Sequence, residues 1–170
     1  MWRMQKQKNL TVGLLAAYLI VLTWIIVFKM QLDFSEFAHY RHVNLIPFGG
    51  ALVVNGRIDV SEMLLNVAVF VPFGVYLCML GGQGDWLKKA VPVLGVSLAY
   101  EAAQYILAVG GSDVTDLLLN TAGGILGFAL FGVLQKLLKG RTVPVLNLLA
   151  LVGTIFVLAF LGLLVGANMA

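Results

Sequence analysis

The sequence has 170 residues, of which 61% are hydrophobic and 11% charged, and its formal net charge is +3. A water-soluble domain carries about 25% charged residues, so this composition excludes a soluble globular protein and predicts an integral membrane protein. The length leaves no room for a separate soluble domain, and we expect residues 1–170 to form a single membrane domain. The only cysteine, Cys78, excludes an intramolecular disulfide.

Five apolar runs predict an all-α, polytopic five-helix transmembrane bundle. The first run, 10–28, follows a basic segment, and at about 18 residues it is too long for a cleaved signal sequence, so we expect a retained helix. The others are 63–80, 90–109, 116–138 and 143–166. The connection 29–62 contains a short apolar stretch, 45–54, which cannot cross a bilayer of about 30 Å. This stretch predicts a partly re-entrant or interfacial loop, or a packed loop.

The distribution of basic residues predicts the orientation in the membrane. With a cytoplasmic N-terminus, eight of the eleven Lys and Arg residues lie inside and the C-terminus is extracytoplasmic. The eight are Arg3, Lys6, Lys8, Lys88, Lys89, Lys136, Lys139 and Arg141. Topology accounts for these residues, so no nucleic-acid binding is expected. Of the eight carboxylates, only Asp85 then faces the cytoplasm, which indicates that any chemistry faces outward.

Glu101 is the most informative polar residue, because it lies inside the third apolar run. Eight residues from the outer end of a helix correspond to a depth of about 12 Å. A charge there costs a few kcal/mol, so this carboxyl group must be protonated, paired or beside a wet cavity. Gln104 and Ser97 share its helical face. For Ser97 we favour a contact between helices, whereas Glu101 is a candidate functional residue and the candidate catalytic residue.

The fourth run carries a polar stripe at spacings of three and four residues. It consists of Asp113, Asp116, Asn120, Gly123 and Gly127. The two glycines indicate close packing against another helix. Asp113 follows two glycines and a serine, as a helix N-cap does, and Asp116 suits the first turn of that helix. Capping and chemistry therefore both remain open for the two aspartates.

Two further segments supply polar groups on the same predicted side of the membrane. Asn66 lies one turn below the outer surface, and Pro72 leaves a carbonyl deeper in the same run without its helical donor. Arg41 and Asn44 precede the stretch 45–54, and Arg41 is the best candidate counter-ion for Glu101. We therefore predict one outward-facing polar pocket, formed by Arg41, Asn44, Asn66, Glu101, Gln104, Asp113, Asp116 and Asn120.

A metal site is a weaker alternative. His39 and His42 flank Arg41, and His42 with Asp113 and Asp116 offers the ligand types that divalent metals bind. A pair of histidines three residues apart, without a second matched motif, is more often an interfacial feature. We expect no cofactor and no resident metal.

Together these motifs resemble the VanZ-like family of bacterial membrane proteins, named for an accessory protein of a glycopeptide-resistance cluster that confers low-level teicoplanin resistance. The resemblance is carried by residues 44–48 (NLIPF), residues 66–74 (NVAVFVPFG), Glu101 with Gln104, and the stripe that begins at Asp113. It covers about residues 12–138 and leaves the run 143–166 outside as an additional helix. Members often carry an arginine where Gly111 stands, which shifts any anion contact to Arg41. The resemblance implies a role at the bacterial cell envelope.

Three functions fit these features. The first is a binding or protective protein, which engages a lipid-linked cell-wall precursor or an amphiphilic glycopeptide in the pocket and contributes to teicoplanin tolerance. The second is an intramembrane enzyme acting on a lipid-linked precursor, with Glu101 as general base and Asp113 and Asp116 around a divalent cation. The third is a proton-linked lipid transporter, for which five spans without a visible repeat are a poor match. We favour the first, with membrane lipids as the surrounding partners.

Overall fold

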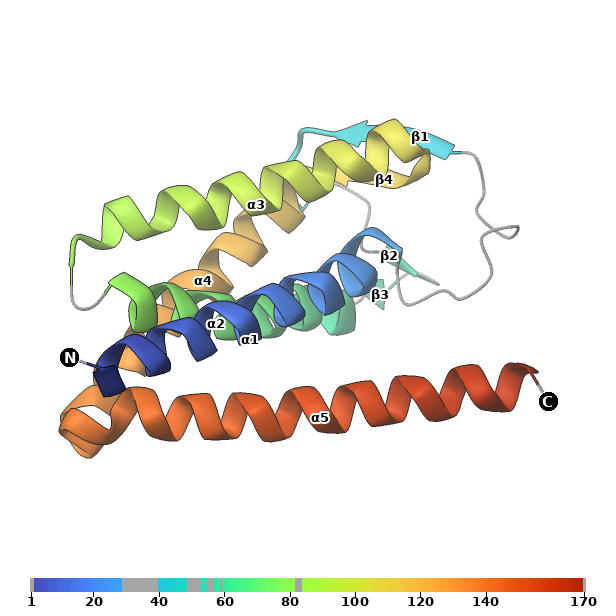
Figure 1. Ribbon diagram of the computed structural model, residues 1–170. Coiled ribbons are helices and arrows are strands. Elements are labelled where there is room, and N and C mark those ends of the chain that lie inside the picture. The colour runs from blue at the N-terminus through green and yellow to red at the C-terminus, as the bar shows by residue number, and fades with distance from the viewer. Residues whose placement is uncertain are drawn as a thin grey trace.

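The computed structural model describes residues 2–28, 40–48, 53–54, 57–58, 60–81 and 84–169, and within these residues the chain forms five long α-helices (Figure 1). They are α1 (Trp2–Val27), α2 (Val60–Gly81), α3 (Trp86–Leu107), α4 (Val114–Leu138) and α5 (Thr142–Met169), and a 3-10 turn, η2 (Lys139–Arg141), joins the last two. The helices alternate in direction, so that the start of α1 and the end of α5 lie at opposite ends of the bundle.

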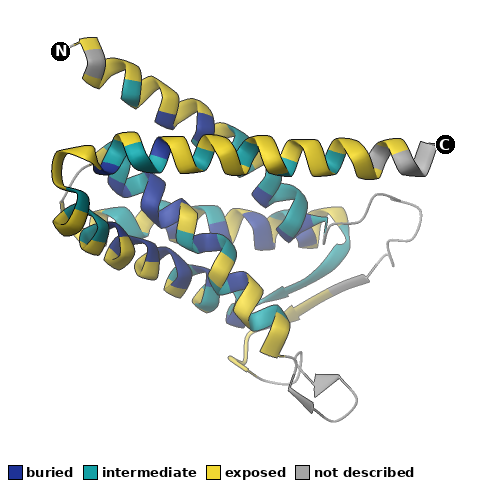
Figure 2. Cartoon of the chain, turned by 90° about the horizontal axis from the view of Figure 1, so that it is seen from below, coloured by how far each residue is buried: buried dark blue, intermediate teal, exposed yellow. Residues whose placement is uncertain are grey.

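Four helical segments are long and apolar enough to cross a membrane. They are Met4–Val27, Val60–Gly81, Trp86–Leu107 and Val114–Leu164. The last covers 51 residues, because it includes α4, η2 and most of α5. Large apolar side chains point outward, as in Phe156 and Leu163 of α5, and Figure 2 shows exposed residues along most of that helix. A soluble protein would not expose such a surface, so the membrane character predicted from composition is confirmed.

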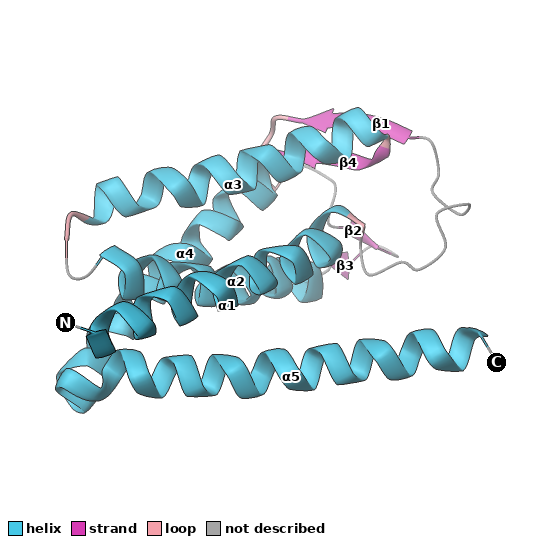
Figure 3. Ribbon diagram, in the orientation of Figure 1, coloured by secondary structure: helices cyan, strands magenta, loops and turns pink. Residues whose placement is uncertain are grey.

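The described chain is largely helical, as the sequence predicts, and it also forms short strands that were not predicted (Figure 3). Strand β1 (Tyr40–Asn44) pairs in parallel with β4 (Val109–Asp113), and Asn44 lies opposite Asp113. A second pair, β2 (Val53–Val54) with β3 (Arg57–Ile58), is antiparallel. Strand β4 follows α3 closely, because Ala108 ends α3 in the left-handed conformation and turns the chain back beside β1.

Helices α2 and α4 approach each other closely at a set of glycines. A Cβ atom added at Gly123 or Gly127 would collide with a backbone carbonyl oxygen of α2. One added at Gly74 would collide with the carbonyl oxygen of Gly124 across the same contact. The packing role predicted for Gly123 and Gly127 is therefore confirmed, and it places the polar end of α4 beside the start of α2.

The apolar core lies where the first four helices meet. Each helix supplies a fully buried side chain: Leu22 from α1, Phe70 from α2, Val93 from α3 and Phe128 from α4. Helix α5 joins this bundle near its own N-terminal end, through contacts with α1. The core therefore fixes α1 to α4 relative to one another, and these are the helices that position the polar residues described next.

Candidate functional site

Three buried polar side chains of α3 each bind a different part of the fold. Ser97, Glu101 and Gln104 are 0%, 5% and 4% exposed, and their spacing places them on one face of the helix. Asn120 of α4 donates its side-chain amide to Ser97 Oγ at 2.9 Å. The Gln104 amide nitrogen donates to the backbone carbonyl of Ile26 at the end of α1, also at 2.9 Å. This face therefore ties α3 to both α1 and α4.

Glu101 stabilises the β4–α4 corner, the point at which β4 ends and α4 begins. Its Oε2 accepts a hydrogen bond from the backbone N–H of Asp113 at 2.8 Å, and its own backbone carbonyl accepts one from Ser112 Oγ at 2.7 Å. Asp113 is the N-cap of α4, because its Oδ1 accepts from the backbone N–H of Thr115 at 2.7 Å. The capping role considered for Asp113 is therefore confirmed.

The segment 44–48 covers the N-terminal end of α4. Asn44 donates its side-chain amide to Asp113 Oδ2 at 3.0 Å, and its Oδ1 accepts the backbone N–H of Ile46 at 3.1 Å. The backbone N–H of Phe48 donates to Thr115 Oγ1 at 3.0 Å. Both carboxylate oxygens of Asp113 are thus engaged, one by the cap and one by Asn44. The motif in this segment serves to attach β1 and the following turn to α4.

A cavity of about 140 Å³ lies next to this corner, between α1, α2, α3 and α4. It is lined by Ile25, Ile26, Glu62, Leu65, Asn66, Gln104, Asp116 and Asn120. The Asn66 amide nitrogen donates to Asp116 Oδ1 at 2.6 Å. Gln104 Oε1 and Asn120 Oδ1 are buried and have no hydrogen-bond partner among the described residues. An unsatisfied buried carbonyl oxygen costs about 1–3 kcal/mol, so these two oxygens are candidate acceptors beside the cavity.

The sequence-predicted residues fall into two adjoining groups. Asn66, Gln104, Asp116 and Asn120 line the cavity. Asn44, Glu101 and Asp113 form the hydrogen-bonded corner beside it and do not line it. Because Glu101 and Gln104 are one turn apart on α3, the two groups share a helix face.

The basic and metal-ligand candidates are only partly placed. The backbone of Arg41 lies in β1 opposite Gly110, whereas its side chain, like the whole of His39, lies outside the described residues. His42 lies opposite Gly111 in the same strand pair. In the described part of the chain, no three His, Cys, Asp or Glu side chains gather as a metal site would require, so His42, Asp113 and Asp116 are not brought into such a group.

Two features of the structure were missed by sequence reasoning. Glu62 lines the cavity, and its position one helical turn before Asn66 was a usable signal. At the opposite end of the bundle, Asn147 of α5 is 1% exposed and receives a hydrogen bond from Thr11 of α1 at 3.0 Å. Its amide donates to the Gln7 side chain at 2.7 Å. The available signal was the presence of isolated polar residues in apolar runs. This contact connects α5 to α1.

A sequence model of the VanZ/LLP1 family matches residues 15–135. The chain belongs to this family. Protein VanZ of Enterococcus faecium is 40% identical to it over 131 residues, which cover 76% of this chain and 78% of that protein. No solved structure shows a significant match. The VanZ/LLP1 region contains the corner and the cavity, whereas α5 follows it, and the resemblance found in the motifs is confirmed.

Proposed function

We propose that this VanZ/LLP1 protein contributes to glycopeptide tolerance, that of teicoplanin in particular, by binding an amphiphilic or lipid-linked ligand in its polar cavity. Family membership supports the role at the cell envelope. The observation that carries the binding step is that Gln104 and Asn120, two residues lining the cavity, each have a buried side-chain oxygen with no hydrogen-bond donor among the described residues. Such groups are rare in folded proteins and mark positions where a ligand or water completes the hydrogen bonding.

The proposal includes a five-span topology with a cytoplasmic N-terminus. The described helices have 26, 22, 22, 25 and 28 residues, each sufficient for one crossing of a hydrocarbon core about 30 Å thick. The basic turn η2 separates α4 from α5, and the other predicted inner basic residues lie at the same end of the bundle. The cavity is near the opposite end, which this topology places in the outer half of the membrane.

Reporter fusions test this topology. A reporter fused at Lys88 is expected to behave as cytoplasmic, and one fused after residue 170 as extracytoplasmic. Alkaline phosphatase and a green fluorescent protein, each active on one side only, give the two readings. Exchange of the two signals would place the cavity on the cytoplasmic side and contradict access from outside.

The segment 44–48 supports access from the membrane surface. Leu45, Ile46 and Phe48 are 75%, 69% and 57% exposed, although their backbone is fastened to α4. Apolar side chains on a fastened turn at the end of a bundle suit the interfacial layer of a bilayer. We propose that this turn anchors the entrance in the outer leaflet, where an amphiphile approaches.

Teicoplanin tolerance in a susceptible Gram-positive host tests the function. Expression of the chain is expected to raise the inhibitory concentration of teicoplanin. Gln104→Leu and Asn66→Leu are expected to return it to the vector level, because each removes polar atoms from the cavity at similar volume. The protein must be quantified in the membrane, so that loss of tolerance is compared at equal abundance.

Gln135→Leu is the matched control. Gln135 lies on α4 and also has a buried side-chain oxygen without a partner in the described part of the chain, but it does not line the cavity. This variant is expected to keep full tolerance. Equal tolerance in the Gln104 variant and in the control, at equal abundance, would contradict a role of the cavity.

A further inference from the structure

The end of the bundle opposite the polar cavity is strongly basic, and we call it the basic end. In Figure 1 the start of α1 and the turn between α4 and α5 both lie there. The segments 1–9, 82–89 and 136–144, which meet the helices at this end, carry eight Lys or Arg residues and one acid, Asp85. Asp85 caps α3, because its Oδ1 accepts the backbone N–H of Leu87 at 3.0 Å. The sequence composition alone therefore makes this end positive.

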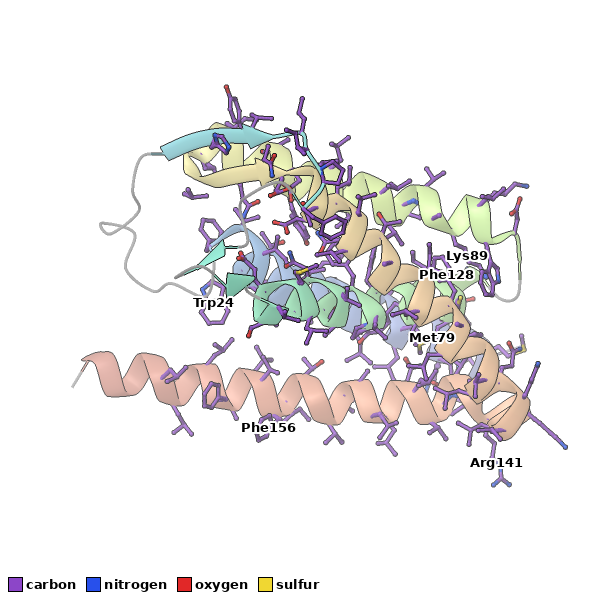
Figure 4. All side chains as sticks on the ribbon, turned by 180° about the vertical axis from the view of Figure 1, so that it is seen from behind. Trp24, Met79, Lys89, Phe128, Arg141 and Phe156 are labelled. Atoms are coloured by element: carbon purple, nitrogen blue, oxygen red, sulfur yellow. The ribbon has the colours of Figure 1, made fainter. Side chains whose placement is uncertain are left out.

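A cavity of about 1000 Å³ lies at the basic end, between the first two turns of α1, the last turn of α2 and the start of α5. Figure 4 shows Met79, which lines it, toward the end of the bundle that Arg141 marks. Among the described residues of its wall, Lys8 is the charged one and none is an acid. Gly140 also lines it and stands between Lys139 and Arg141 in η2. This basic-end cavity therefore suits an anion.

The orientation of the Gln7 side chain adds a hydrogen-bond donor to the same wall. Asn147 of α5 is buried, and its Nδ2 donates to the backbone carbonyl of Gln7 at 3.1 Å. A carbonyl can only accept, so this contact determines the orientation of the Asn147 amide. Its second hydrogen bond, at 2.7 Å, must then go to the side-chain oxygen of Gln7. The Gln7 amide nitrogen is the atom that Asn147 does not use, and Gln7 lines the basic-end cavity.

The surroundings of the basic-end cavity suit a membrane–water interface. Trp2 and Met4 line it and are exposed, and Lys6 Nζ lies 3.6 Å from the centre of the Trp2 ring. Tryptophan is enriched at the interfacial level of a bilayer. On α5, the exposed side chains of Leu148 and Leu149 follow within two turns of the helix start. A ligand with an anionic head and acyl chains uses both surfaces, whereas a soluble anion uses only the first.

We propose that the basic-end cavity binds the phosphodiester head group of an anionic phospholipid. Lys8 supplies the charge, the Gln7 amide nitrogen supplies a hydrogen bond, and the acyl chains lie against the first turns of α5. Phosphodiester oxygens accept strong hydrogen bonds from cationic donors. A zwitterionic phospholipid also carries an ammonium group, which the basic end repels, so it binds less well. This inference goes beyond the proposed function and does not depend on what binds in the polar cavity.

Quenching of Trp2 fluorescence by brominated phospholipids tests the proposal. The full chain with Trp24→Phe and Trp86→Phe keeps Trp2 as its single tryptophan. It is reconstituted into phosphatidylcholine bilayers that contain either brominated phosphatidylglycerol or brominated phosphatidylcholine. Because Trp2 lines the basic-end cavity, a lipid bound there quenches it. We expect stronger quenching by the brominated phosphatidylglycerol and a smaller difference at high salt. Equal quenching by the two lipids would overturn the proposal.

Three variants that each lower the net charge by one distinguish a binding site from diffuse attraction. Lys8→Gln removes the cation of the wall and is expected to weaken relative binding of phosphatidylglycerol about tenfold, as for a lost hydrogen bond to a charged group. Gln7→Glu keeps an oxygen for Asn147 but replaces the N–H donor by a negative oxygen, so it should weaken binding similarly at an unchanged unfolding midpoint. Lys88→Gln, at an exposed position of α3 outside the wall, is the matched control and should leave binding unchanged.

The other outcomes are also decisive. If all three variants weaken the preference for phosphatidylglycerol equally, the basic end attracts anionic lipids only as a diffuse layer, and the site is overturned. Quenching that is unchanged by Lys8→Gln and Gln7→Glu has the same meaning. Calorimetric binding of inorganic phosphate that depends on Lys8, without a preference between the two lipids, would assign the cavity to a soluble anion and overturn the phospholipid.

Discussion

Replacing Gly123 or Gly127 with alanine is expected to remove most of the folded protein from the membrane. The added Cβ would collide with a carbonyl oxygen of α2, and neither helix backbone can yield locally. Overpacking of this kind costs about 1–3 kcal/mol, and separation of the helices also loses the contacts of neighbouring side chains such as Phe70. Membrane abundance and the thermal unfolding midpoint in detergent are the measurements.

Gly132→Ala is the control for this effect. Gly132 lies on the same helix, and a Cβ atom there meets nothing within 4 Å. Alanine is favoured over glycine inside a helix by about 0.5–1 kcal/mol, so this variant should be as stable as the natural chain or slightly more stable. A lower unfolding midpoint for Gly127→Ala together with an equal or higher one for Gly132→Ala would establish the contact between α2 and α4. Similar losses at both positions would indicate a general sensitivity of α4 to substitution.

The helices were predictable because an apolar run of about 20 residues has few other structures available to it in a membrane. The polar stripe of α4 was predictable for a related reason, since spacings of three and four residues define one helix face. The residues of that face have the separate roles that their chemical types suggest. Asp113 caps the helix, Asp116 and Asn120 line the cavity, and the glycines meet α2. Helical periodicity therefore predicted what is local to one helix.

The remaining features depend on contacts between distant segments, which no local pattern encodes. Strands β1 and β4 each have five residues, and Asn44 and Asp113 are 69 positions apart, so neither strand shows an alternation that predicts the pairing. Gly74 and Gly124 were not singled out, because their role follows from where α2 and α4 cross. The division into corner and cavity likewise depends on Glu101 pointing to β4 while Gln104 points to α1.

Glu101→Leu is expected to destabilise the fold strongly, and Glu101→Gln only weakly. The carboxylate of Glu101 is the acceptor for the backbone N–H of Asp113, the residue that both caps α4 and binds Asn44. Leucine leaves that N–H without an acceptor at a site where Glu101 itself is 5% exposed, which costs about 1–3 kcal/mol of unfolding free energy. Glutamine keeps an oxygen at the same position. Thermal unfolding in detergent and hydrogen exchange at the Asp113 amide compare the two variants.

If Glu101→Leu and Glu101→Gln lower the stability of the fold equally, the charge of Glu101 matters in addition to its role as a hydrogen-bond acceptor. This is the result that the predicted pairing of Glu101 with Arg41 requires, because Glu101→Gln then leaves a guanidinium without its partner. The double variant Glu101→Gln with Arg41→Gln separates the cases. If the two charges are paired, the double variant loses less stability than the two single variants lose together, because the second change removes the unpaired charge left by the first. Additive losses would contradict the pair and leave Glu101 as the acceptor that orders the β4–α4 corner beside the cavity.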